Sequence, residues 1–397
     1  MRSTLVIGKN RIRLWDWLLV IGIMLAPMTG LRIWKVGPAE VLCLLWTLKY
    51  YPRRYLHVND TLKFFAAFLA TMLVGSLIGL LKAPQELSRS GYLTWLYLAY
   101  IALAMYEGLR RNSLECNETL LNRIATLSVL WYLFLYVYSI TVSRYFFGAP
   151  LWYANYRFSG GGRNPHQVAV LMCGVIFVLL RNLVKKRGKL FPALLIAVSI
   201  YIVTETKSAT AYVAIALGLF VALYFFLGQK IKNKRKRITL LILEAVVIAV
   251  FLVVFYRLLS TRLYAWILSD SNGMGRLEIF ASFFETFVKS PLVGLGPGVH
   301  GRGGAIEFHN TYLEILAATG IVGFSAFFVY SVRVFKKLLS DYMLIPIIVA
   351  MYAYGLAGFA MRRLAYWGLM ISILVIGEQY WEKQQNQQPA TADGEQR

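Results

Sequence analysis

Long apolar runs fill most of this 397-residue chain. A helix needs about 20 residues to cross the hydrocarbon core of a bilayer, and backbone groups in lipid must be hydrogen-bonded internally. The runs therefore predict an all-α, polytopic integral membrane protein with about twelve transmembrane helices, a few of them short. They lie near 14–28, 36–50, 62–81, 91–109, 120–141, 165–182, 190–204, 208–228, 238–259, 311–332, 342–360 and 364–381.

Composition excludes a soluble protein, because 58% of the residues are hydrophobic and only 15% are charged, against about 25% charged in soluble domains. The net charge of +23 would suggest a nucleic-acid partner in a soluble chain. In a membrane protein it is better explained by basic residues in cytoplasmic loops, so no nucleic-acid partner is expected. Cys43, Cys116 and Cys173 have no short spacing and imply neither a disulfide framework nor a metal site.

Basic residues also predict the topology. With alternating spans, 27 of the 42 Lys and Arg residues fall on one side, including the run KIKNKRKR, and 15 fall on the other. The positive-inside rule then places both termini in the cytoplasm. Residues 1–381 are expected to form one transmembrane domain, with outer loops at 142–164, 204–208 and 260–310, and residues 382–397 a disordered polar cytoplasmic tail.

The 15 outer cations are the informative ones, because the rule disfavours them there. Arg163 precedes Asn164, a helix cap, and Pro165, while Lys207 lies in the short turn TETKSAT. A cation at a helix N-terminus opposes the helix dipole by about 0.3–1 kcal/mol, so an anionic ligand is expected nearby. The alternative is that these side chains snorkel to lipid headgroups. That alternative is preferred for Arg32, Lys35, Lys82 and Arg89, and ligand binding for Arg163 and Arg276.

The interval from 273 to 320 is the longest one outside the apolar runs. Arg276 opens a helical run in which one face carries Leu277, Phe280, Phe284, Phe287 and Val288. This pattern predicts a short amphipathic helix on the outer membrane surface, or a stripe packed on neighbouring helices. The glycines that follow, Gly294, Gly296 and Gly298, allow tight turns and close approach to a ligand.

His309 comes just before the next apolar helix. Thr311 and Glu314 have the spacing of a capping box, which places His309 outside the positive end of that helix. The position favours a neutral imidazole that accepts a proton. The alternative is a hydrogen-bonded structural histidine, with Glu307 or Glu314 as the base.

Three segments together resemble the O-antigen polymerase and O-antigen ligase superfamily. They are HNTYLEILAATG (309–320) preceded by SPLVGLGPG, RFSGGGRNPHQVA (157–169), and TETKSAT (204–210). The last has Lys207 where Arg is usual in that superfamily, which keeps the charge and loses the bidentate fork.

The resemblance implies a GT-C-like, metal-independent, inverting glycosyltransferase that uses an undecaprenyl-diphosphate-linked glycan as donor and needs no cofactor. It implies His309 as general base and Arg276 as a catalytic cation. The diphosphate would be bound by Arg157, Arg163, Lys207, Arg276 and Arg302, with Asn310, Glu314, Gly296 and Gly298 in supporting roles.

Within that superfamily a polymerase, whose acceptor is another lipid-linked glycan, is preferred to a ligase, whose acceptor is the lipid A core. A transporter of lipid-linked sugars is the alternative from another class. The implied location is the bacterial inner membrane with a periplasmic active site. Membrane lipids and a chain-length regulator are the further partners.

Overall fold

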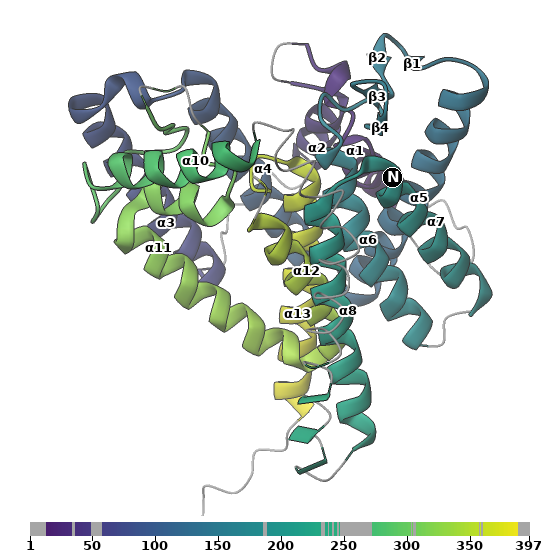
Figure 1. The fold of residues 1–397 in the computed structure, drawn as a ribbon. Coiled ribbons are helices and arrows are strands. Elements are labelled where there is room, and N and C mark those ends of the chain that lie inside the picture. Colours follow the sequence, from purple (N-terminus) through teal and green to yellow (C-terminus); the bar gives the residue numbers. More distant parts are fainter. Residues whose placement is uncertain are drawn as a thin grey trace, which may run out of the picture.

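The computed structural model describes residues 13–33, 36–48, 58–185, 189–231, scattered positions from 235 to 246, 272–302, 304, 307–356, 358 and 360–387. Helices dominate these residues (Figure 1). They are α1 (Asp16–Leu25), α2 (Pro38–Leu48), α3 (Asp60–Lys82), α4 (Arg89–Arg110), α5 (Leu114–Thr141), α6 (His166–Val184), α7 (Leu190–Thr206), α8 (Ala209–Lys230), α10 (Asn272–Phe287), α11 (Thr311–Leu338), α12 (Ile345–Gly355) and α13 (Leu364–Gln387).

Short elements complete the description. Three 3₁₀ helices are η1 (Thr29–Leu31), η2 (Pro84–Glu86) and η3 (Leu339–Leu344). Two small antiparallel hairpins interrupt the expected all-α pattern after α5, where Phe147, Gly148, Ala154 and Asn155 have positive φ and turn the chain sharply. Their strands are β1 (Tyr145–Phe146), β2 (Ala149–Pro150), β3 (Trp152–Tyr153) and β4 (Arg157–Phe158).

The apolar helices confirm a membrane protein, but the count of twelve spans is not confirmed. Within the described residues, five segments are long and apolar enough to cross a bilayer: Asp60–Lys82, Leu114–Thr141, His166–Val184, Ala209–Gly228 and Thr311–Gly355. Helices α1 and α2 have 10 and 11 residues. At about 1.5 Å per residue they cover roughly half of a hydrocarbon core of about 30 Å. The predicted span 238–259 lies largely outside the described residues.

Helix α6 lies at the centre of the bundle. It is apolar on all sides, and α5, α7, α8, α12 and α13 all contact it. A helix with this composition is stable only when surrounded. Its start therefore gives a fixed reference point for the loops around it.

The loops gather at two ends of the bundle. We call the end where β1–β4 and α10 lie the loop end (Figure 1). Backbone bonds join its segments: Gly30 N–H donates to the Gly161 carbonyl (2.8 Å), and Ser88 N–H to the Gly298 carbonyl (2.9 Å). The segments predicted to be outside meet here, wherever they are described. Which end faces the cytoplasm stays a prediction.

The opposite end contains a buried ion cluster. Arg181, 1% exposed, pairs with Glu118 of α5 (2.5 Å) and Asp341 of η3 (2.6 Å). Lys185 also contacts Asp341 (2.7 Å), and the Tyr380 hydroxyl of α13 donates to Glu118 (2.6 Å). Four elements are thereby joined around one guanidinium group.

Helix α13 extends further than predicted, to Gln387, so part of the expected disordered tail is helical. Glu382 pairs with Arg110 (2.8 Å), and the Gln384 amide donates to the Ser340 carbonyl (3.1 Å). These contacts explain why the helix continues. Residues 388–397 lie outside the described part.

Helix α11 is broken at Gly320, whose φ of 62° is not helical. The glycine-rich turn supplies backbone partners at the break: Leu295 N–H donates to the Ala317 carbonyl and Gly296 N–H to the Ala318 carbonyl, both at 2.9 Å. A broken helix is tolerated at membrane depth only where its freed groups are satisfied in this way. The turn after α10 is therefore part of the framework of α11.

Helix α10 is an actual helix that lies across α3 and α11 (Figure 1), but its apolar stripe differs from the predicted one. Phe283 is buried, stacks on Phe287 (centroids 5.5 Å apart) and meets Phe308 edge to face. Phe284 and Val288, which belong to the predicted apolar face, are 61% and 67% exposed. The described part of α10 therefore has one apolar edge packed on Phe308 and one exposed apolar edge.

Replacing Arg181 with Met is expected to lower the free energy of unfolding by up to about 3–5 kcal/mol, because Glu118 and Asp341 would remain buried with Lys185 as their one cation. Thermal unfolding in detergent measures this. Arg333→Met is the matched control, since its pair with Asp60 (3.5 Å) is exposed and such pairs contribute about 0–1 kcal/mol. Equal losses in the two variants would contradict a structural role for the buried cluster.

Candidate active site

His309 stands at the loop end, immediately before α11. Its side chain is 64% exposed, and its φ of 45° lies in the left-handed region. The next residue, Asn310, caps the helix: its side-chain oxygen accepts from the N–H groups of Tyr312 (2.9 Å) and Leu313 (3.1 Å). Its amide also donates to the Leu356 carbonyl (2.7 Å). Asn310 therefore fixes the start of α11 against the end of α12.

The predicted helix start at Thr311 is confirmed, but the predicted capping box is wrong. The Thr311 hydroxyl donates to the Gly358 carbonyl (2.9 Å) and accepts from Ala360 N–H (3.0 Å). Glu314 is buried and is bound by Arg362 rather than by the backbone of the first turn. The side chains of Thr311 and Glu314 therefore bind groups of the α12–α13 loop instead of the backbone N–H groups of a capping box.

Arg362, in that loop, is the centre of the polar cluster beside His309. Its Nη1 donates to Glu307 Oε1 (2.9 Å), and its Nη2 contacts both Glu314 Oε1 and His300 Nε2, the latter at 3.2 Å. The side chain is 16% exposed. Three segments distant in sequence, around 300–307, at the start of α11 and before α13, thus meet at one guanidinium group.

The contact with Arg362 determines the tautomer of His300. A guanidinium group only donates hydrogen bonds, so His300 Nε2 must be the acceptor. Its Nδ1 then carries the proton and donates to the Gly304 carbonyl (3.3 Å). Burial and the neighbouring Arg362 charge both lower the pKa of His300, which favours this neutral form.

Glu307 lies between the two histidines. Its Oε2 is 3.9 Å from His309 Nδ1, and its Oε1 is 3.8 Å from His300 Nε2. Burial raises the pKa of the Glu307 carboxyl, but the charge and hydrogen bond of Arg362, with the two histidines where they are protonated, outweigh burial and hold that pKa below its usual value. The carboxylate is therefore ionised at neutral pH.

A second group of contacts joins α6, α8 and α12. His166, the first residue of α6, has its Nδ1 3.0 Å from the Ser208 hydroxyl and 2.9 Å from the Tyr354 hydroxyl. Ser208 caps α8, and Tyr354 lies near the end of α12 with Arg363 over its ring (5.8 Å). The segments 157–169 and 204–210 are brought together here, as the sequence predicted, with the α12–α13 loop beside them.

Two of the predicted phosphate ligands lie side by side. Arg157 donates from Nε to the Thr206 carbonyl (2.9 Å) and from Nη2 to the Lys207 carbonyl (3.4 Å). Lys207 ends α7 in a left-handed conformation, and its amine lies 5.1 Å from the centroid of the Tyr156 ring. Arg157 is thus partly occupied in closing the end of α7, while the Lys207 side chain is exposed.

Arg163 has an exposed side chain, and its backbone N–H donates to the Thr29 hydroxyl (3.0 Å). The Asn164 side chain accepts from His166 N–H (2.9 Å), and α6 begins at His166, one residue later than predicted. Arg302 is exposed in a left-handed turn (φ 46°). Arg276 lies within α10, which begins at Asn272 rather than at Arg276; its side chain lies outside the described part.

Gly296 and Gly298 approach neighbouring helices closely. A Cβ on Gly296 would lie 2.6 Å from Ser76 Cα of α3, and one on Gly298 would lie 2.5 Å from Tyr92 N of α4. Both residues have positive φ, 92° and 81°. The two glycines therefore let the turn pack closely onto α3 and α4.

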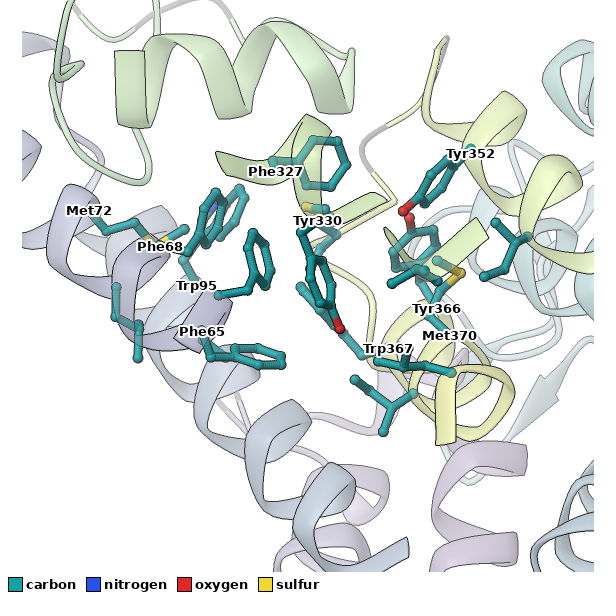
Figure 2. Close-up of a pocket in the computed structure, with 18 residues that line it drawn as sticks. Phe65, Phe68, Met72, Trp95, Phe327, Tyr330, Tyr352, Tyr366, Trp367 and Met370 are labelled. Atoms are coloured by element: carbon teal, nitrogen blue, oxygen red, sulfur yellow. The ribbon is translucent and has the colours of Figure 1, made fainter. Parts of the chain in front are cut away.

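A partly open apolar cavity lies between α3, α4, α11, α12 and α13. Figure 2 shows Phe65 and Phe68 on one side and Trp367 and Met370 on the other, with Tyr330 between them. Met361, also in its lining, directly precedes Arg362. The cavity therefore begins beside the polar cluster and extends into the membrane-spanning part of the bundle.

The sequence interpretation missed Arg362, His300 and Tyr354. Arg362 and Arg363 are two of the 15 cations on the predicted outer side, and their adjacency in a short loop is the signal that could have singled out Arg362. Nothing local marks His300 or Tyr354. Among the described residues, no three His, Cys, Asp or Glu side chains gather to hold a metal ion. Independence of metal stays a prediction.

Residues 192–328 match the family model for O-antigen ligase. This match supports the resemblance of the chain to the superfamily of O-antigen ligases and polymerases. The match includes Lys207, Arg276, Arg302 and His309, whereas the α12–α13 loop lies beyond it. No curated protein matches the chain.

The lowered pKa of His300 makes the loop end sensitive to acid. A base whose pKa is lowered by folding stabilises the fold at pH values above its unfolded pKa of 6.5, and that stability is lost as the pH falls towards the folded pKa. We expect the melting temperature to fall between pH 7.5 and 5.5, and to fall less in His300→Gln, whose amide oxygen still accepts from Arg362. His309→Gln, with an exposed side chain, is the control; an unchanged pH dependence in His300→Gln would contradict the account.

Proposed function

We propose that this chain is a bacterial surface-polysaccharide polymerase. It moves a glycan from an undecaprenyl-diphosphate donor to a hydroxyl group of a second lipid-linked glycan, with inversion and without a metal. The site is the loop end, facing the periplasm, in a protein of the inner membrane with both termini in the cytoplasm. A chain-length regulator is a further partner in this proposal.

The observation that carries the proposal is the position of the apolar cavity. Aromatic and methionine side chains line it inside the membrane-spanning part, and Met361 at its edge adjoins Arg362 and the His309 cluster. An apolar cavity next to a polar cluster suits a lipid with a long hydrocarbon chain and a charged head. The chain would bury apolar area in the cavity while the head contacts the polar groups.

The chemistry proposed for the head is a single displacement. His309 takes the proton of the acceptor hydroxyl as its oxygen forms a bond to the anomeric carbon of the donor. The bond from that carbon to the diphosphate breaks on the opposite face, and the diphosphate leaves with its charge. The exposed position of His309 allows a sugar hydroxyl to reach its imidazole.

Cations stabilise the charge that develops on the leaving diphosphate. Lys207, Arg163 and Arg302 have exposed side chains at the loop end, and Arg157 lies beside Lys207. Arg276 completes this set in the proposal. Guanidinium groups bind phosphate oxygens in pairs, which makes an arginine more effective here than a lysine.

A ligase is the second candidate, because the family model that matches residues 192–328 is described as O-antigen ligase. The two candidates differ only in the acceptor, a second lipid-linked glycan or the lipid A core. The same site chemistry serves both.

Detergent-purified protein given lipid-linked donor and acceptor tests the proposal. Elongated glycan on the lipid diphosphate is the expected product, and both substrates recovered chemically unchanged would indicate a transporter instead. A deletion strain then distinguishes the two enzymes. Single-repeat sugars on the lipid A core are expected for a polymerase, whereas long chains stranded on the lipid diphosphate would identify a ligase.

The cavity gives a separate prediction. Ala99, 7% exposed, lines it from α4, and Ala99→Trp should fill part of it. We expect KM for a long-chain donor to rise, with a smaller change for a donor whose hydrocarbon chain is shortened. Leu223→Trp on α8, at a 47% exposed position away from the cavity, is the control. Equal effects on long and short donors would argue against a lipid chain in the cavity.

A further inference from the structure

We propose that Glu307, held by Arg362, is the positioning residue that orients His309 for catalysis. The inference rests on the proposed function, because it assigns a partner to the histidine that acts there as general base. It adds two residues, Glu307 and Arg362, that act through His309 rather than on the substrate.

The two oxygens of Glu307 face different partners. Oε1 accepts from Arg362 Nη1 at 2.9 Å, while Oε2 faces His309 Nδ1 at 3.9 Å. One oxygen is thus anchored and the other is directed at the imidazole. Hydrogen bonds of catalytic groups are often long in unliganded sites and shorten when substrate binds, so 3.9 Å is compatible with a bond in the working complex.

Arg362 is itself held by two further side chains. Its Nη2 contacts Glu314, which is 2% exposed, and His300 Nε2 at 3.2 Å. These contacts restrict the guanidinium group of Arg362. Its hydrogen bond to Glu307 Oε1 then restricts the position of the Glu307 carboxylate. Support of this kind is what a catalytic group needs to be held in productive geometry.

The same contacts argue against Glu314 as the base. Its carboxylate is buried in the first turn of α11 and bound by Arg362, where a sugar hydroxyl has no access. Glu307, 42% exposed, is committed to Arg362 through one oxygen. His309 is the most exposed titratable side chain of the cluster and the one that reaches outward.

The orientation determines which nitrogen reacts. When His309 Nδ1–H donates to Glu307 Oε2, Nε2 has no proton and can take one from the acceptor hydroxyl as the glycosidic bond forms and the bond to the diphosphate breaks. The resulting imidazolium is next to a carboxylate, which stabilises it. The other charged and titratable groups of this cluster are His300, Arg362 and Glu314.

Glu307→Gln tests the proposal through the pH dependence of turnover. The amide still accepts from Arg362 but no longer stabilises the imidazolium, so the acid limb of kcat should move to lower pH. We expect kcat to fall by part of the about 10²–10⁴-fold that general-base catalysis contributes, with KM for the donor nearly unchanged. Glu307→Asp should recover part of the activity and of the limb. Glu285→Gln, exposed on α10, is the matched control and should keep the wild-type profile.

A second measurement does not depend on activity. The chain has four histidines, and the nitrogen resonances of His309 in labelled full-length protein are identified by their loss in His309→Gln. The titration midpoint of its imidazole should move to lower pH in Glu307→Gln. Unchanged midpoint and acid limb in Glu307→Gln, while His309→Gln loses the limb, would overturn the positioning role and leave the base in place. Retention of the limb in His309→Gln would instead remove the histidine base from the proposed function.

Discussion

A guanidinium group buried among apolar helices needs carboxylate partners, and two arginines impose this constraint on the two ends of the bundle. Taking a charge out of water costs several kcal/mol unless partners compensate for it. Arg181 is joined to α5, η3 and, through Tyr380, α13, whereas Arg362 joins the start of α13 to α11 and to the segment before it. Apolar packing has little directional preference between helices in lipid, so these charge pairs select the relative positions of α11 and α13.

The break in α11 is the second feature on which the site depends. Gly320 interrupts the helix, and the segment after α10 pairs with the freed backbone groups. The same segment continues through Gly298 to His300, whose N–H donates to the Glu86 carbonyl (2.8 Å). One stretch of chain thereby satisfies the backbone groups at the break in α11 and also places the His300 imidazole against Arg362.

At the loop end, the buried polar groups hold Arg362 in place and the exposed polar groups are accessible to a substrate. His300 and Glu314 are almost inaccessible and hold Arg362, while Glu307 is half exposed and His309 reaches outward. Rigidity comes from the inner groups, which have no water to replace their partners. Access to a substrate comes from the outer ones, and the apolar cavity begins at the same place.

The sequence by itself determined the helical membrane class, the approximate positions of the described spanning helices α3, α6 and α8, the grouping of loops at two ends, and the start of α11 at Thr311. Those features follow from local apolar runs, charge distribution and capping residues. Tertiary structure decided the packing of Phe283 of α10 on Phe308, and the partners of Thr311 near Gly358. It also decided the meeting of Arg362 with His300, 62 positions earlier in the chain. No local pattern encodes a contact at that separation, because it exists only after the helices between the two residues have packed.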